Sequence, residues 1–207
     1  MNIKTIPVGQ LETNCYVVIN EETLECVVID PGDESNTILD YMESNKLKCK
    51  AIMLTHGHFD HVGAVNEIYK ATGCTVYINE RDEGYKVGMS GMLFKLPEGG
   101  KTYDEGDVIV EAGLAFKVLA TPGHTPGSVT LAIGDNLFTG DTLFCGSCGR
   151  TDFPGSSPKD MMVSLCCLAV IDGDYHVYPG HDRSTTLDFE RKSNPFMRYA
   201  MEKFGRK

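Results

Sequence analysis

The chain has 207 residues, of which 42% are hydrophobic and 23% charged, and this length and composition predict one globular domain spanning residues 1–207. The formal net charge of −10 disfavours nucleic acid as a partner, and no apolar run reaches the length of a membrane span, so we expect no membrane partner. Eight cysteines without a visible signal segment indicate reduced thiols and predict a cytoplasmic protein.

The first half of the chain is predicted to alternate between strands and helices. Short apolar runs bounded by turn residues predict strands at residues 2–8, 14–20, 24–30, 51–54 and 74–78. Apolar residues at helical spacing predict helices at residues 34–45, 62–71 and 79–87. The third strand is expected to stop at Asp30, which opens the turn sequence Asp-Pro-Gly-Asp.

Residues 88–107 form the least regular part of the predicted structure. Glycine and proline interrupt them repeatedly, which predicts a surface loop. Apolar side chains are nevertheless frequent in this loop, at Met89, Met92, Leu93, Phe94 and Leu96. Two interpretations stay open, because such side chains either cover the core or form a lid over a site.

The second half repeats the order of strands followed by helices. Two hairpins are expected, from residues 108–111 with 115–120, and from residues 128–133 with 136–139. A helix over 158–171, a strand over 175–178 and a helical tail over 184–204, interrupted at Asn194-Pro195, complete the chain. The two halves therefore each predict a sheet with helices outside it, packed together.

A cluster of metal-binding residue types follows the strand at 51–54. His56, His58, Asp60 and His61 fall within the pattern H-x-H-x-D-H. Imidazole nitrogens and carboxylate oxygens are the ligands that zinc and similar divalent metals prefer. Side chains alternate along an extended segment, so His56 and His58 project to the same side, whereas Asp60 and His61 lie on the following turn. This spacing suits two metal ions.

Three further candidates each lie just beyond an apolar run. His124 stands on a turn with two prolines and two glycines, Asp141 follows residues 137–139, and His181 follows residues 175–178. Ligands at strand ends along one rim of a sheet are a common way to build a site. The remaining histidine, His176, lies inside a predicted strand, and a structural role is favoured for it.

In this order and context, the motif with its later His, Asp and His resembles the metallo-β-lactamase superfamily over nearly the whole chain. The resemblance implies an α+β fold, a four-layer αββα sandwich with the metal site at one edge. It also implies two divalent ions, zinc being expected and iron or manganese being alternatives. The first ion would be held by His56, His58 and His124, the second by Asp60, His61 and His181, and Asp141 would bridge both.

Within that superfamily the chain resembles the glyoxalase II-like hydrolases, on residues 140–144 and 148–150. Only a short tail follows His181, where full-length members carry a helical domain, so the resemblance is to short, single-domain hydroxyacylglutathione hydrolases and leaves the thiol carrier open. By this resemblance Arg150 would bind a carboxylate of the carrier. The alternative is a surface arginine paired with Asp152.

The resemblance implies hydrolysis of a small acyl thioester similar to S-lactoylglutathione, by a hydroxide shared between two metals. Asp60 and Asp141 are the predicted catalytic residues, Asp60 because it is placed to orient the nucleophile. The alternative is a persulfide dioxygenase with one iron, a family that residues 148–153 also resemble. A degenerate member is disfavoured by the full ligand set, and a structural zinc at Cys145-x-x-Cys148 has low weight because no suitable second pair exists. The oligomeric state stays open.

Overall fold

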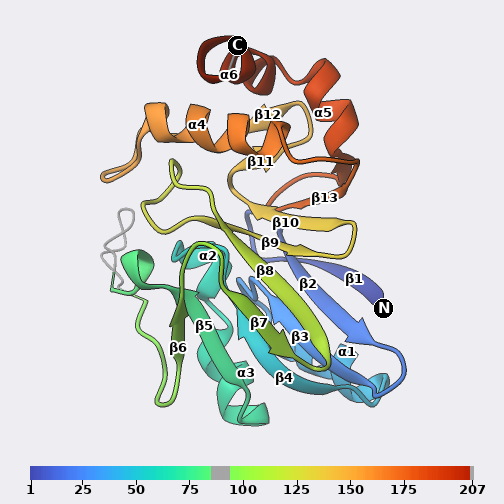
Figure 1. Ribbon diagram of the computed structural model, residues 1–207. Helices are drawn as coiled ribbons and strands as arrows, with labels where there is room; N and C mark the ends of the chain where they lie inside the picture. The colour runs from blue at the N-terminus through green and yellow to red at the C-terminus, as the bar shows by residue number, and fades with distance from the viewer. Residues whose placement is uncertain (85–93, 206–207) are drawn as a thin grey trace.

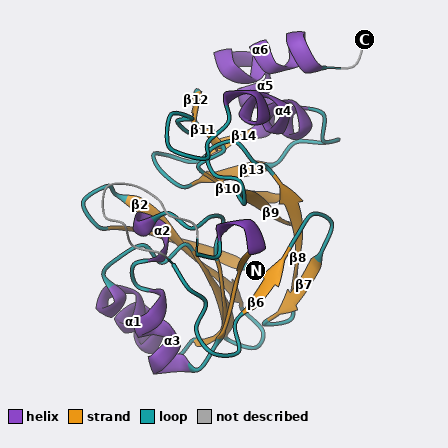
Figure 2. Cartoon of the chain, turned by 90° about the vertical axis from the view of Figure 1, so that its left-hand side faces the viewer, coloured by secondary structure: helices purple, strands orange, loops and turns teal. Residues whose placement is uncertain are grey.

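Two six-stranded sheets face each other and carry helices on their outer faces (Figures 1 and 2). The computed structural model describes residues 1–84 and 94–205. In the first sheet the strands lie in chain order: β1 (Asn2–Val8), β2 (Thr13–Asn20), β3 (Glu25–Ile29), β4 (Lys48–Met53), β5 (Thr75–Asn79) and β6 (Lys101–Tyr103). Its helices are α1 (Ser35–Ser44), α2 (Phe59–Val62) and α3 (Val65–Thr72).

The second sheet has the order β14-β13-β10-β9-β8-β7. Its strands are β7 (Val108–Glu111), β8 (Leu114–Ala120), β9 (Val129–Ile133), β10 (Asn136–Gly140), β13 (His176–Pro179) and β14 (Thr185–Thr186). A small hairpin and three helices cover it: β11 (Leu143–Phe144), β12 (Ser147–Cys148), α4 (Pro158–Ala169), α5 (Leu187–Ser193) and α6 (Pro195–Phe204). The α+β four-layer sandwich is therefore confirmed. Among the described residues, no helix is both long and apolar enough to cross a bilayer.

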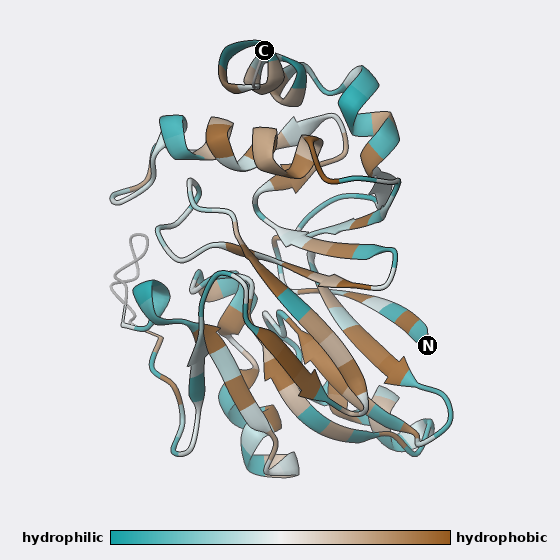
Figure 3. Ribbon diagram, viewed as in Figure 1, coloured by the Kyte–Doolittle hydropathy of each residue, from teal (hydrophilic) through white to brown (hydrophobic). Residues whose placement is uncertain are grey.

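The strand β2, next to the edge strand β1, shows why four layers form. Its side chains alternate between two buried clusters, because successive residues of a strand point to opposite faces. Val17 belongs to the core between the first sheet and its helices, whereas Tyr16 and Val18 belong to the core between the two sheets. A third core, which includes Leu137 and Leu165, lies between the second sheet and α4. Figure 3 shows hydrophobic residues concentrated along the strands of both sheets.

Some predicted elements have other bounds. Of the helix expected over 79–87, the described residues form only a short 3₁₀ turn, η1 (Glu80–Asp82), and residues 85–87 lie outside the described part of the chain. The helix expected over 62–71 is divided into α2 and α3. The division occurs where Gly63 packs on Gly32, since a Cβ on Gly63 would lie 2.2 Å from the Gly32 carbonyl oxygen.

The predicted loop 88–107 contains the short strand β6, which pairs parallel with β5 and was missed because only three residues take part. Phe94 is buried in the core of the first sheet, where Leu96 packs against it, so these two side chains cover core. Met89, Met92 and Leu93 lie outside the described residues. The strands β11 and β12 were also not predicted, since each has two residues and no period to recognise. The tail expected to be helical over 184–204 begins with the strand β14, and its helices begin only at Leu187.

Candidate metal centre

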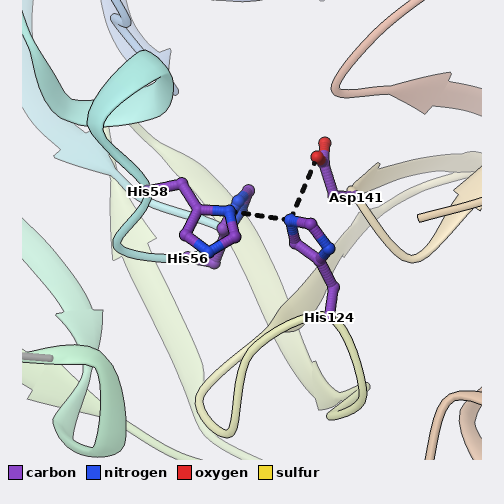
Figure 4. Close-up of side chains that lie close together, drawn as sticks. All are labelled: His56, His58, His124 and Asp141. Carbon is purple, nitrogen blue, oxygen red and sulfur yellow. Dashed lines mark hydrogen bonds and ion pairs between the residues drawn. The ribbon is translucent and has the colours of Figure 1, made fainter. Parts of the chain in front are cut away.

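The first group of predicted ligands converges from three loops at one rim of the sandwich. His56 and His58 follow β4, His124 lies between β8 and β9, and Asp141 follows β10 (Figure 4). His58 Nδ1 lies 2.7 Å from His124 Nε2, and His124 Nε2 lies 3.2 Å from Asp141 Oδ2. These four side chains are buried and place one donor atom each within 4.8 Å of the others.

The second group lies beside the first and shares Asp141 with it. Asp60 Oδ2 lies 3.6 Å from His61 Nε2 and 3.3 Å from His181 Nε2. One oxygen of Asp141 lies 3.4 Å from His61 Nε2, and the other lies 3.6 Å from His181 Nε2. The structure thus brings all seven predicted ligands together and puts Asp141 between the two groups.

Hydrogen bonds at the opposite ring nitrogen orient most of these imidazoles. His124 Nδ1 donates to the Arg150 carbonyl at 2.8 Å, and His181 Nδ1 donates to the Leu11 carbonyl at 3.1 Å. His61 Nδ1 faces Asp30 Oδ2 at 3.0 Å. Such contacts fix the ring orientation and leave Nε2 free toward the centre, as in metal-binding histidines.

Several buried atoms at the centre indicate that a cation belongs there. Among the described residues, His56 Nε2, His58 Nε2, His61 Nε2 and Asp141 Oδ1 are buried without a hydrogen-bond partner. Buried polar atoms normally have partners, so such a concentration in one place requires an explanation. Nitrogen and carboxylate donors are the ligands of zinc and of other borderline divalent metals, so the cluster fits two such ions.

The surroundings shift the pKa of the histidines in opposite directions in the two ligand groups. Burial and the neighbouring imidazoles lower the pKa of His58 to about 3, so its ring is neutral at pH 7 and has a lone pair to offer. Burial alone would lower the pKa of His181, but hydrogen bonds to Asp141 and Asp60 raise it to about 10. Burial would raise the pKa of Asp141, but the charge of His61 and bonds from His124 and His181 hold it well below its usual value. Metal binding to the second group must therefore displace protons.

Asp30 supports the candidate centre, although its sequence context indicates only the end of a strand. It is 1% exposed and accepts hydrogen bonds from the Thr55 backbone N–H at 2.7 Å and the Thr55 hydroxyl at 2.6 Å, besides its contact with His61. The available signal was its position, since Asp30 follows β3 and β3 is the parallel neighbour of the strand before His56.

A cavity of about 450 Å³ opens over the two groups. Its lining combines the carboxylates Asp60 and Asp141 with the aromatic side chains Phe59, Phe144 and Phe153. Arg150 lines the same cavity. Aromatic side chains together with convergent polar groups are typical of a small-molecule site.

The side chain of Arg150 forms two hydrogen bonds with Asp152, at 2.6 and 2.7 Å, and lies 4.2 Å from the Phe153 ring centroid. The structure therefore shows the pair with Asp152 and also places Arg150 beside the centre. Its role toward a carrier stays a prediction. All eight cysteines lie in the described part of the chain as free thiols, and Cys145 accepts a hydrogen bond from Arg183 at 3.3 Å. His176 is exposed on β13, away from the ligand groups.

We expect the purified protein to bind two divalent ions per chain. Each of the two groups has at least three donors, and Asp141 serves both. Elemental analysis of metal-saturated, desalted protein should approach two equivalents. A plateau at one equivalent under excess metal would contradict the dinuclear centre.

Comparison with known proteins gives one consistent family. Residues 8–190 match the family model described as the metallo-beta-lactamase superfamily. The hydroxyacylglutathione hydrolase GloC of Haemophilus influenzae is 33% identical over 95% of this chain and 98% of its own length. The probable metallo-hydrolase YqgX of Bacillus subtilis is also 33% identical, with the same coverage of both chains.

Three crystal structures extend this result. The B3 metallo-beta-lactamase BLEG-1 aligns with a TM-score of 0.85 at 30% identity, over 95% of this chain and 99% of its own. TTHA1623 in a di-iron-bound form aligns with a TM-score of 0.82 at 38% identity, over 93% of this chain and 99% of its own. ETHE1 from Myxococcus xanthus aligns with a TM-score of 0.79 at 27% identity, over 100% of this chain and 92% of its own. TTHA1623 therefore shows a protein of this fold with two iron ions bound.

Proposed function

Because this chain belongs to the metallo-beta-lactamase superfamily, we propose that it is a metal-dependent hydrolase that cleaves a small acyl thioester of the hydroxyacylglutathione type, such as S-lactoylglutathione. The observation that carries the proposal is the complete double ligand group under a cavity open to small molecules. The likeness to GloC over nearly the full length of both chains supports this substrate class. The free thiols favour the cytoplasm as the place of action.

His56, His58 and His124 would hold one ion, Asp60, His61 and His181 the other, and Asp141 both, with zinc as the proposed metal. Two bound divalent ions would polarise the acyl carbonyl and make water nucleophilic near neutral pH.

The chain itself then has to bind and orient the reactants. Asp60 accepts a hydrogen bond from the Thr13 hydroxyl at 3.2 Å and faces the cavity, so its carboxylate is held where it can orient an attacking water. The aromatic side chains Phe59, Phe144 and Phe153 line the cavity, where they would surround the acyl group and exclude bulk water.

The proposal is tested by assaying the purified protein with S-lactoylglutathione and, separately, with glutathione persulfide. The metal content is measured on the same sample. We expect release of glutathione from the thioester with two ions bound. Oxygen consumption with the persulfide, together with a single iron, would instead establish the dioxygenase, which the stretch Cys148–Phe153 and the likeness to ETHE1 favour as second candidate. A β-lactam belongs in the assay as well, because of the likeness to BLEG-1.

We expect Arg150→Ala to raise KM for S-lactoylglutathione about tenfold, with kcat, metal content and melting temperature little changed. An arginine can hold a carboxylate with two parallel hydrogen bonds, and loss of binding that is equal in ground and transition states appears in KM. A small thioester without that carboxylate should be hydrolysed as by the wild type.

Asp152→Ala is the matched control, because it removes the partner that Arg150 now contacts. If Arg150 binds the carrier, freeing its guanidinium leaves KM unchanged or lowers it. If the ion pair alone matters, the two variants behave alike and the carrier is held elsewhere.

A further inference from the structure

Asp82 is a buried carboxylate at the end of η1 that the ligand groups do not include. Its side chain is 0% exposed. A buried carboxylate is costly unless hydrogen bonds satisfy it, so its partners show what it does. From the described residues it accepts three hydrogen bonds, all from residues adjacent or nearly adjacent to the candidate metal-binding histidines.

The three donors belong to the two loops that carry the three-histidine half of the centre. The backbone N–H of Gly57, between His56 and His58, donates to Asp82 Oδ2 at 2.9 Å. The Thr125 hydroxyl donates to the same oxygen at 2.7 Å, and the Gly127 N–H donates to Oδ1 at 2.7 Å. One carboxylate thus joins the loop after β4 to the loop before β9.

The contact has little room to adjust. A Cβ on Gly57 would lie 2.9 Å from the Asp82 carbonyl oxygen, and a Cβ on Gly127 would lie 2.5 Å from Asp82 Oδ1. Both glycines therefore allow the backbone to approach Asp82 closely. Across this junction, His58 Nδ1 and His124 Nε2 face each other at 2.7 Å (Figure 4).

We propose that Asp82 is a positioning residue for the ion held by His56, His58 and His124, and that it acts by fixing the separation of the two loops that carry these rings. This role rests on the metal centre proposed above. Asp30 offers a comparison within the same protein, since it contacts both His61 of the second group and Thr55 beside His56, whereas Asp82 joins the two loops of the three-histidine half.

Asp82→Asn keeps the shape of the side chain and changes its hydrogen bonding. If the amide oxygen takes the place of Oδ2, it keeps the bonds from Gly57 and Thr125, and the NH₂ group then faces the Gly127 N–H. Two donors face each other, so the loop after His124 must move away. The reverse orientation puts the NH₂ group against the Gly57 N–H, with the same kind of conflict.

The test measures affinity in metal-free protein, by zinc titration against a chromophoric chelator, in two backgrounds. His181→Ala leaves the three-histidine half intact, and His58→Ala leaves the other half. In the His181→Ala background we expect Asp82→Asn to weaken zinc binding roughly 10- to 100-fold, the usual effect of removing support behind a ligand. In the His58→Ala background we expect Asp82→Asn to weaken zinc binding less than about twofold. Asp30→Asn should weaken zinc binding in both backgrounds, because Asp30 contacts His61 of one half and Thr55, beside His56, of the other.

Thr125→Val is a milder variant that removes one hydrogen-bond donor to Asp82. It tests the positioning role if Asp82→Asn does not fold. It should weaken only the three-histidine half, by a smaller factor. Unchanged affinity in that half, or equal loss in both halves, would overturn the role of Asp82. Wild-type protein that binds no zinc would overturn the metal centre as well, whereas two ions bound without an effect of either variant would overturn the positioning role alone.

Discussion

Asp141→Ala should lower kcat/KM for the thioester by a factor on the order of 10³ or more, the scale of losing one member of a catalytic group that works as a unit. Asp141 is the residue between the two ligand groups, with oxygens 3.4 Å from His61 Nε2 and 3.2 Å from His124 Nε2. Its loss removes one ligand from each ion at once. It also removes one of the carboxylates that face His61 and His181, where Asp60 remains.

Asp60→Ala is the matched comparison, because it removes a carboxylate that contacts only the second group, at His61 and His181. We expect a smaller loss of activity, and retention of one ion where Asp141→Ala loses affinity for both. The measurements are kcat/KM and metal content on the same preparations, with thermal unfolding as the folding control. Equal residual rates at unchanged metal content would contradict the bridging role of Asp141.

The candidate ligands were predictable from the sequence because their chemistry and spacing are local. His56, His58, Asp60 and His61 fall within six consecutive residues, and the strand-end positions of the later ligands follow from runs of apolar residues. Because β10 and β13 are parallel neighbours, Asp141 and His181 lie at the same rim. The αββα architecture followed from the resemblance, and the repeated order of strands and helices agreed with it.

The residues that support the ligands were not predictable in this way. Asp30 and Asp82 stand in turn sequences where an aspartate ordinarily serves the local backbone. Their hydrogen bonds go instead to loops distant in the chain, such as those of Thr55 and Thr125. The very short strands were missed for a related reason, since a strand of two or three residues is defined by its neighbour and not by its own pattern.

The importance of Gly180 was also not predictable, since the sequence shows only a glycine between a strand and His181. Its backbone passes against the metal centre. A Cβ there would lie 2.2 Å from Asp141 Oδ1 and 2.8 Å from His61 Cε1, both shorter than side chains tolerate. The surroundings cannot relax easily, because the Gly180 N–H donates to the Gly140 carbonyl at 2.9 Å and its carbonyl accepts from Asn14 at 2.7 Å.

We therefore expect Gly180→Ala to displace the Asp141 carboxylate and to lower kcat/KM on the order of 100-fold, the cost of a misplacement of about 1 Å in a catalytic group. Gly146→Ala is the matched control. Gly146 has a φ of +73° and nothing within 4 Å of its added Cβ, so this variant bears only backbone strain, about 1 kcal/mol of stability. Kinetics and thermal unfolding of both variants separate the two effects. If Gly180→Ala lost stability but kept its rate and both ions, the close packing against Asp141 would serve folding and not the alignment of the metal centre.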